Sequence, residues 1–221
     1  MKNRSEFIKN INVRKIIIPA AVLICTVSIA ALSTNRTMKP IGVSKKETVT
    51  NAIKKDSIAS VKAFEKVYAV LMSPRCMNCH PSGDIPLQGD DSHIHTMQPK
   101  RGVDGKGLYA MKCANCHQPE NTPGSHTPPG NPNWHLPPAN MKMVFQGKTA
   151  HELAKQLVDP KQNGNKDMKK LIEHADDGLV LAGWKPAEGL KLPPMSHAEF
   201  KKAWITWLET GAYAPQPNPL K

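Results

Sequence analysis

Two short segments of the chain share one pattern of cysteine and histidine. Residues 76–80 read CMNCH and residues 113–117 read CANCH. The gap of two residues turns both thiols toward the same side, where they can form thioethers with the two vinyl groups of one haem. The histidine that follows can then give its Nε2 to the iron. The sequence therefore predicts two covalently bound c-type haems. The predicted attachment residues are Cys76, Cys79, Cys113 and Cys116, and the predicted iron ligands beside them are His80 and His117.

Two other uses of paired cysteines fit the spacing less well. A zinc ribbon also carries two Cys-x-x-Cys pairs, but about 15–20 residues usually separate them. Here residues 80–112 lie between the pairs, and zinc would not require a histidine directly after each one. A thioredoxin-like redox motif would need a strand–helix context that this sequence lacks. Haem attachment is therefore the favoured interpretation.

The distance between the motifs constrains the arrangement of the haems. From Cys76 to Cys113 the chain advances by 37 residues. A complete domain for one haem needs more chain than this, so two independent domains cannot fit. We expect the two haems to share one fold and to lie close together.

An iron that only passes electrons needs a second axial ligand, and methionine raises the reduction potential relative to histidine. His95 is the first candidate, because its loop follows the first motif and can fold back over a haem. His135 follows Trp134 in a proline-rich loop, and His174 lies on a predicted helix. Met143 stands in an apolar patch, where a role in the core is the more common one. Each candidate histidine has the alternative of an ordinary exposed side chain.

The N-terminal 32 residues have the form of an export signal. Positively charged residues precede an apolar run over residues 16–32, which is interrupted by Pro19. This pattern is typical of a cleaved signal peptide or of an uncleaved membrane anchor, and either one exports the rest of the chain to the periplasm. Cys25 lies inside the apolar run and is interpreted as a bystander. Export agrees with the motifs, because bacteria attach haem covalently outside the cytoplasmic membrane.

The chain is basic, with a formal net charge of +12. Its Lys and Arg residues are dispersed and are not interleaved with aromatic residues, so nucleic-acid binding is not expected. A mildly basic face for an acidic redox partner and ordinary solvated surface charge both remain open. Aromatic residues make up 5% of the chain and prolines number 20, which predicts a modest core with many irregular segments.

The pattern of apolar residues predicts helices and no clear strand. One amphipathic helix begins near Ser57 and ends before Pro74, with a stripe that includes Ile58, Phe64 and Leu71. Capping boxes predict helix starts at Thr149 and Ser196. The other expectations are a short helix over 108–116, a loop over 118–140, and a helix over 166–175. The expected fold class is mainly α, with cytochrome c-like helices and long irregular proline-rich loops around two covalent haems. The expected divisions are a signal peptide or anchor over 1–32, a polar linker over 33–56, a di-haem domain over 57–215 and a tail over 216–221.

Residues 193–212 resemble the last helix of bacterial cytochrome c domains, where a proline/methionine turn precedes a capped, tryptophan-rich helix that ends in Gly-Ala. More broadly, residues 60–213 resemble a family of exported two-haem cytochromes. Members of that family are often labelled as subunits associated with isoquinoline 1-oxidoreductase, a molybdenum hydroxylase. The segments that carry this resemblance are 72–76 (MSPRC), 86–91 (PLQGDD), 133–138 (NWHLPP) and 143–145 (MVF). The resemblance implies that the chain accepts electrons from such an enzyme. Any hydroxylase chemistry would belong to another polypeptide, because no further cysteines remain here to hold an iron–sulfur cluster.

The expected function is that of a periplasmic electron carrier and not of an enzyme. It would take single electrons from a dehydrogenase and pass them to another cytochrome or an oxidase of the respiratory chain, with an inner-membrane tether if the N-terminal segment is retained. Two alternatives require an iron with an open sixth position. They are a di-haem peroxidase-like enzyme and a haem-based sensor.

Overall fold

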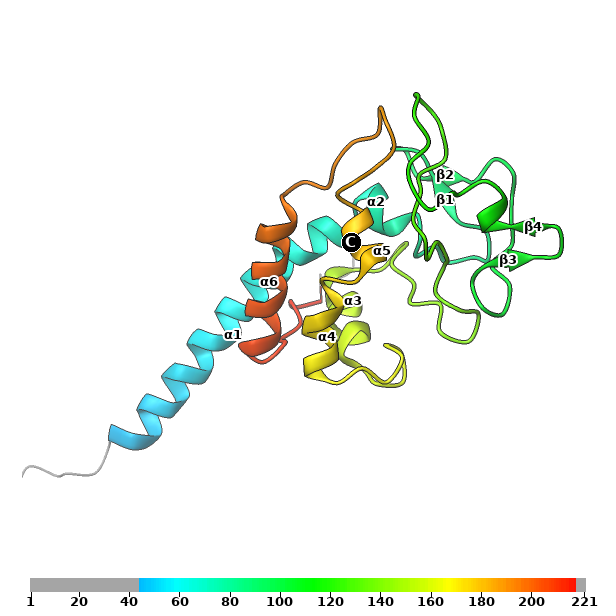
Figure 1. Ribbon diagram of the computed structural model, residues 1–221. Coiled ribbons are helices and arrows are strands. Elements are labelled where there is room, and N and C mark those ends of the chain that lie inside the picture. The colour runs from blue at the N-terminus through cyan, green and yellow to red at the C-terminus, as the bar shows by residue number, and fades with distance from the viewer. Residues whose placement is uncertain (1–43, 218–221) are drawn as a thin grey trace, which may run out of the picture. The chain divides into compact units, whose positions relative to one another are not determined.

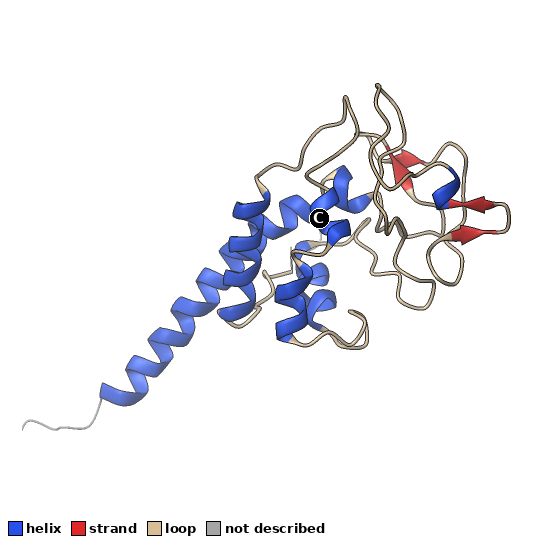
Figure 2. Cartoon of the chain, viewed as in Figure 1, coloured by secondary structure: helices blue, strands red, loops and turns tan. Residues whose placement is uncertain are grey.

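The computed structural model describes residues 44–217. The predicted signal or anchor, Cys25 and residues 218–221 lie outside this range. Among the described residues, helices are much more abundant than strands, which are few and short, and this confirms the mainly α prediction at that level (Figure 2). Within residues 44–217, no helix is both long enough and apolar enough to cross a membrane.

Helix α1 (Ser44–Leu71) packs against helix α6 (His197–Glu209), and this pair forms the centre of the core (Figure 1). Phe64 of α1 and Trp207 of α6 are both fully buried, with ring centroids 4.6 Å apart. Ser60 donates a hydrogen bond from its hydroxyl to the Trp207 carbonyl, at 3.0 Å. This bond satisfies a polar group that burial would otherwise penalise.

Helix α1 differs from its prediction in length and in its buried face. It begins at Ser44 and not near Ser57, so residues 44–56, which were predicted to be a polar linker, are helical. Ile58 is 49% exposed, whereas Phe64, Val67 and Val70 are buried. The predicted stripe is therefore confirmed at Phe64 and Leu71 and wrong at Ile58, because the buried face includes the smaller Ser60 and Ala63 instead.

Three shorter helices follow the long central loop. Helix α3 (Ala150–Val158) packs against α1, helix α4 (Met168–His174) packs against α6, and helix α5 (Gly178–Ala182) was not predicted. Both predicted capping boxes are present, at Thr149 and at Ser196. In each box the N-cap hydroxyl accepts from the backbone of a glutamate whose carboxylate binds back to the N-cap residue, which satisfies donors that a helix start leaves unpaired.

Two antiparallel pairs of very short strands lie among the loops. Strand β1 (Leu87–Gln88) pairs with β2 (His93–Ile94), and β3 (Gly107–Leu108) pairs with β4 (Met111–Lys112). The predicted helix over 108–116 was wrong, because β3, β4 and the 3₁₀ turn η1 (Cys113–Asn115) occupy this stretch. Tyr109 has a φ of +49°, a left-handed conformation that suits a hairpin turn and interrupts a helix. The predicted loop over 118–140 is confirmed, since it contains no helix or strand.

Candidate functional site

The first motif is wound into a tight helical turn directly after α1. Pro74 opens helix α2 (Pro74–Met77), where its missing N–H costs nothing, and Cys76 lies within this helix. The backbone N–H of Cys79 donates to the Cys76 carbonyl, at 3.2 Å, and that of His80 donates to the Met77 carbonyl, at 3.0 Å. Residues three apart in such a turn share one face, so the two thiols are brought to one side.

The ring of His80 is fixed by two contacts. Its Nδ1 lies 2.7 Å from the Met143 carbonyl oxygen, which can only accept, so Nδ1 carries the proton and Nε2 keeps a free lone pair. Phe145 stacks on the ring, with centroids 3.9 Å apart and planes 10° apart. Burial lowers the pKa of His80 to about 4, although the bond to Met143 opposes this change. A neutral imidazole with a fixed tautomer and a free Nε2 is the form that binds a metal.

The second motif has the same local geometry on a different scaffold. It follows strand β4 and begins in η1, where the N–H groups of Cys116 and His117 donate to the Cys113 carbonyl, at 3.2 and 2.9 Å. Asn115 supports the turn through a 2.7 Å bond to the Ala110 carbonyl. The 3₁₀ turn η1 therefore folds the second motif into a tight turn, as helix α2 does at the first motif.

His117 is held in the same way as His80. Its Nδ1 lies 2.7 Å from the Pro129 carbonyl oxygen, so Nε2 again keeps the free lone pair. Trp134 stacks on the ring, with centroids 4.1 Å apart and planes 9° apart. Burial lowers the pKa of His117, although the Pro129 carbonyl opposes this change. Both partners belong to the proline-rich loop over 118–140, which gives this loop a positioning role.

All four motif cysteines have free thiols. Burial, followed by the proximity of Cys79, raises the pKa of Cys76 to about 12, and burial raises that of Cys79 to about 11. Burial also raises the pKa of Cys113, whereas Cys116 is exposed. Without a bound group, the buried thiols of the first motif are therefore neutral at ordinary pH.

The two motifs lie close to one another in space. Cys113 is near enough to Cys79 to raise its pKa, after the larger effects of burial and Arg75. His95, the first candidate for a sixth ligand, lies beside His117, with ring centroids 6.4 Å apart. His174 of α4 is near enough to His80 to lower its pKa slightly further, and its own Nδ1 is paired with Asp177. Of these two candidates, His95 is the one whose ring lies beside a motif histidine.

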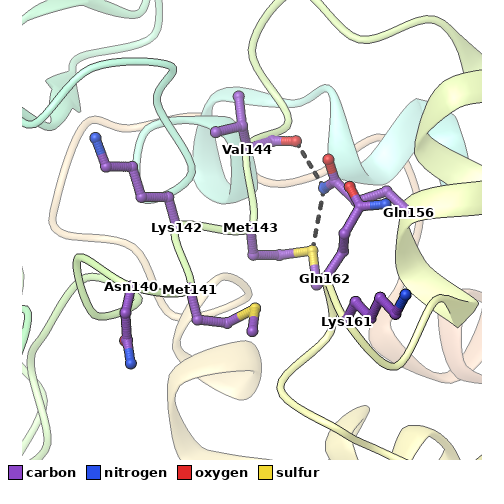
Figure 3. A pocket seen from close by; sticks show the side chains of 8 residues that line it. All are labelled: Asn140, Met141, Lys142, Met143, Val144, Gln156, Lys161 and Gln162. Atoms are coloured by element: carbon purple, nitrogen blue, oxygen red, sulfur yellow. Dashed lines mark hydrogen bonds between the residues drawn. The ribbon is translucent and has the colours of Figure 1, made fainter.

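The other two candidate ligands are placed less favourably. Met143 contacts the His80 ring through its backbone carbonyl on the Nδ1 side, whereas a sixth ligand must lie beyond Nε2. Its sulfur accepts from Gln156 Nε2 at 3.1 Å and lines a pocket of about 220 Å³ with Met141 (Figure 3). The Nδ1 of His135 pairs with the Asn133 carbonyl within its own turn. The neighbouring Trp134 stacks on His117 and not on His135.

No family model, no curated protein and no solved structure matches this chain. Within residues 44–217, His, Cys, Asp and Glu side chains do not gather in groups of three that could hold a metal ion. The geometry of the two motifs is therefore the basis for a functional assignment.

Arg101 is a buried residue of the site that sequence reasoning did not single out. It is 1% exposed, and its guanidinium donates to the carbonyls of Pro137 and Gly83. Its Nε lies 3.7 Å from an oxygen of Asp84, which is too long for a hydrogen bond. The positive charge of Arg101 also lowers the pKa values of Cys79 and His80, behind larger effects in each case. A single arginine in a glycine-rich turn gave no signal in the sequence, because its acceptors are backbone carbonyls of distant loops.

Proposed function

We propose that the protein is an exported di-haem c-type cytochrome that passes single electrons in the periplasm. One observation carries this proposal: both motif histidines have Nδ1 tied to a backbone carbonyl, an aromatic ring stacked on one face and a free Nε2. Histidines that bind metals use the same device, because a hydrogen bond at one nitrogen fixes the tautomer and raises the basicity of the other. Two unrelated scaffolds produce it at the two Cys-x-x-Cys-His motifs.

A haem at each motif would supply a one-electron iron couple whose potential depends on axial ligation and burial. Cys76 and Cys79 would hold the edge of one ring, and Cys113 and Cys116 would hold the other. His80 and His117 would present Nε2 to the irons, while Phe145 and Trp134 keep the imidazole planes from turning. The chain's own contribution is therefore to orient the two imidazoles.

The proposed cytochrome c-like arrangement is supported by the packing of α6 on α1. Helix α6 is the segment that resembles the last helix of bacterial cytochrome c domains, and α1 leads directly into the first motif. The proximity of Cys79 and Cys113 supports two haems within one fold. Exchange of electrons between them would then be rapid.

We propose that the electron donor is a dehydrogenase, for which the resemblance implies the molybdenum hydroxylase class, and that the acceptor is another cytochrome or an oxidase. Without the predicted signal segment the chain remains basic, and a mildly basic face would favour partners with an acidic docking face. Association with such a partner should weaken as ionic strength rises, because the attraction between exposed charges is screened by salt.

The proposal is tested with the protein purified from a host that attaches c-type haem. Intact mass should show two haems, and a Cys76→Ala/Cys79→Ala variant and a Cys113→Ala/Cys116→Ala variant should each retain one. The visible spectrum of the reduced protein should not change when carbon monoxide is added. Absence of covalent haem would overturn the proposal, and carbon monoxide binding at one iron would favour a peroxidase-like enzyme or a sensor.

A further inference from the structure

The inference concerns His95 and His117, and it rests on the proposed function. His95 directly follows strand β2 in the segment between the two motifs, and His117 ends the second motif. Their ring centroids are 6.4 Å apart, and their planes meet at 66°. The two stacked pairs that hold the motif histidines are much closer, at 3.9 Å for His80 with Phe145 and 4.1 Å for His117 with Trp134. The two imidazoles are therefore neighbours that do not stack on each other.

The separation of the two rings matches the requirement for an iron between them. A metal lies about 2 Å from each imidazole nitrogen, and a ring centroid lies about 1 Å beyond its nitrogen, so two axial imidazoles have centroids about 6 Å apart. The observed 6.4 Å agrees with this spacing. The angle between the planes imposes no restriction, because each ring can rotate about its bond to the metal.

His117 can bind a metal through only one of its two ring nitrogens. Its Nδ1 is occupied by the Pro129 carbonyl, and Trp134 covers one face of the ring. The Nε2 atom is the remaining binding position. Among the described residues, the aromatic or imidazole rings beside His117 are those of Trp134 and His95.

The backbone holds His95 in place next to this position. Its N–H donates to the Pro86 carbonyl, at 3.0 Å, and its carbonyl accepts from Gln98, at 2.8 Å. The adjacent strand pair β1–β2 fixes the direction from which the chain reaches it. A 3.3 Å contact from the Met97 N–H to His95 Nδ1 is long, and ligation would break it, because Nδ1 must carry the ring proton once Nε2 binds a metal.

The burial of His95 also suits a ligand. Its side chain is partly buried and lies beside the His117 ring. His93, two residues earlier, is exposed and pairs with Asp91. His93 therefore provides a matched control in the same loop.

We propose that His95 is the sixth ligand of the iron held by His117. The segment between the two motifs would thus supply an axial ligand to the second haem. An iron with two histidine ligands has a lower potential than one with histidine and methionine. The second haem would be six-coordinate and closed to external ligands.

The test uses the holoprotein and three variants, His95→Ala, His95→Met and His93→Ala. With intact mass showing two haems in each, His95→Ala should make one haem high-spin and reactive to carbon monoxide. His95→Met should keep that haem six-coordinate and raise its midpoint potential. His93→Ala should match the unaltered protein in spectrum and potential.

The assignment to the second haem is tested by combining His95→Ala with each pair of cysteine substitutions. The new carbon monoxide binding should appear in the protein that keeps only the haem at Cys113 and Cys116. Two low-spin, unreactive haems in His95→Ala would overturn the inference, and so would a change confined to the haem at Cys76 and Cys79. Failure of the proposed function can be distinguished from failure of this inference, because in that case neither the unaltered chain nor any variant would carry covalent haem.

Discussion

The indole of Trp134 lies flat on the imidazole of His117, with 4.1 Å between ring centroids and 9° between planes. Phe145 has the same relation to His80, at 3.9 Å and 10°. In each case a backbone carbonyl also accepts a hydrogen bond from Nδ1. The stacked partner therefore fixes the plane of the imidazole ring, and the hydrogen bond fixes its rotation within that plane. Parallel aromatic pairs of this kind contribute stability beyond the area that they bury. The aromatic partners are therefore positioning residues for the two proposed iron ligands.

Trp134→Leu keeps an apolar side chain but removes the flat face beneath His117. We expect both haems to remain attached, the midpoint potential of the second haem to shift, and the free energy of unfolding to fall by about 1 kcal/mol. Redox titration followed by visible absorption, together with denaturant unfolding, would measure these changes. Phe145→Leu is the matched variant and should shift the first haem instead. If both variants altered the same haem, the assignment of Trp134 to the second haem and of Phe145 to the first would be wrong.

The helices could largely be predicted from the sequence, because their signals are local. Thr149 and Ser196 form capping boxes whose partners lie three residues away, and both helices start where these boxes place them. The buried face of α1 was predicted less well, since Ile58 satisfies the helical spacing but is 49% exposed. Which apolar residues of a helix are buried depends on the neighbouring helix, and that information is not local.

The candidate site could likewise be predicted only in part, because some of its contacts are local in the sequence and others are not. The six motif residues follow from spacing alone, and His95 was chosen for its loop. The carbonyls of Met143 and Pro129, which hold the two motif histidines, come from loops that carry no sequence signal for this role, because every residue has a carbonyl. The hairpin at Tyr109 was missed because its turn uses a left-handed conformation at a residue other than glycine.

Arg101 should be important for stability even though it belongs to neither motif. Its guanidinium is buried and donates hydrogen bonds to the carbonyls of Gly83 and Pro137, which lie in two separate loops. Arg101→Met leaves those carbonyls without their donor, and we expect the free energy of unfolding to fall by about 3 kcal/mol. Lys100→Met, at the exposed neighbouring residue, should change it by less than about 0.5 kcal/mol. Equal unfolding midpoints for the two variants in denaturant would contradict the role given to Arg101.

The packing of α6 on α1 makes a second stability prediction. Trp207 is fully buried against Phe64, and its indole N–H donates to the Tyr213 carbonyl, at 3.2 Å. Trp207→Ala should lower the free energy of unfolding by about 3–5 kcal/mol, because it opens a cavity in the core. Tyr109→Ala removes an aromatic ring that is 89% exposed and should have little effect. Chemical denaturation of the holoproteins, with haem content confirmed by mass, would measure both changes.

The capping box at Ser196 should make the stability of α6 depend on pH. The Ser196 hydroxyl and N–H both donate to the Glu199 carboxylate, at 2.7 and 3.0 Å, and these bonds lower the pKa of Glu199 in the folded state. The unfolded chain therefore takes up a proton at Glu199 before the folded chain does. The stabilisation is fully present above the unfolded pKa of about 4.5 and is lost as the pH falls through the lower folded value.

Glu199→Gln should accordingly be less stable than the unaltered protein at neutral pH, and the difference should shrink as the solution is acidified below about pH 4.5. Ser196→Ala should show only part of this convergence, because it also removes the pH-independent bond from the Glu199 N–H to the Ser196 hydroxyl. The measurement is the denaturant midpoint of each holoprotein at a series of pH values, at fixed ionic strength. Because the box at Thr149 is intact in both variants, its own acid sensitivity cancels from the comparison. A difference that stayed constant from neutral to acidic pH would mean that Glu199 acts through packing or helix propensity and not through its charge.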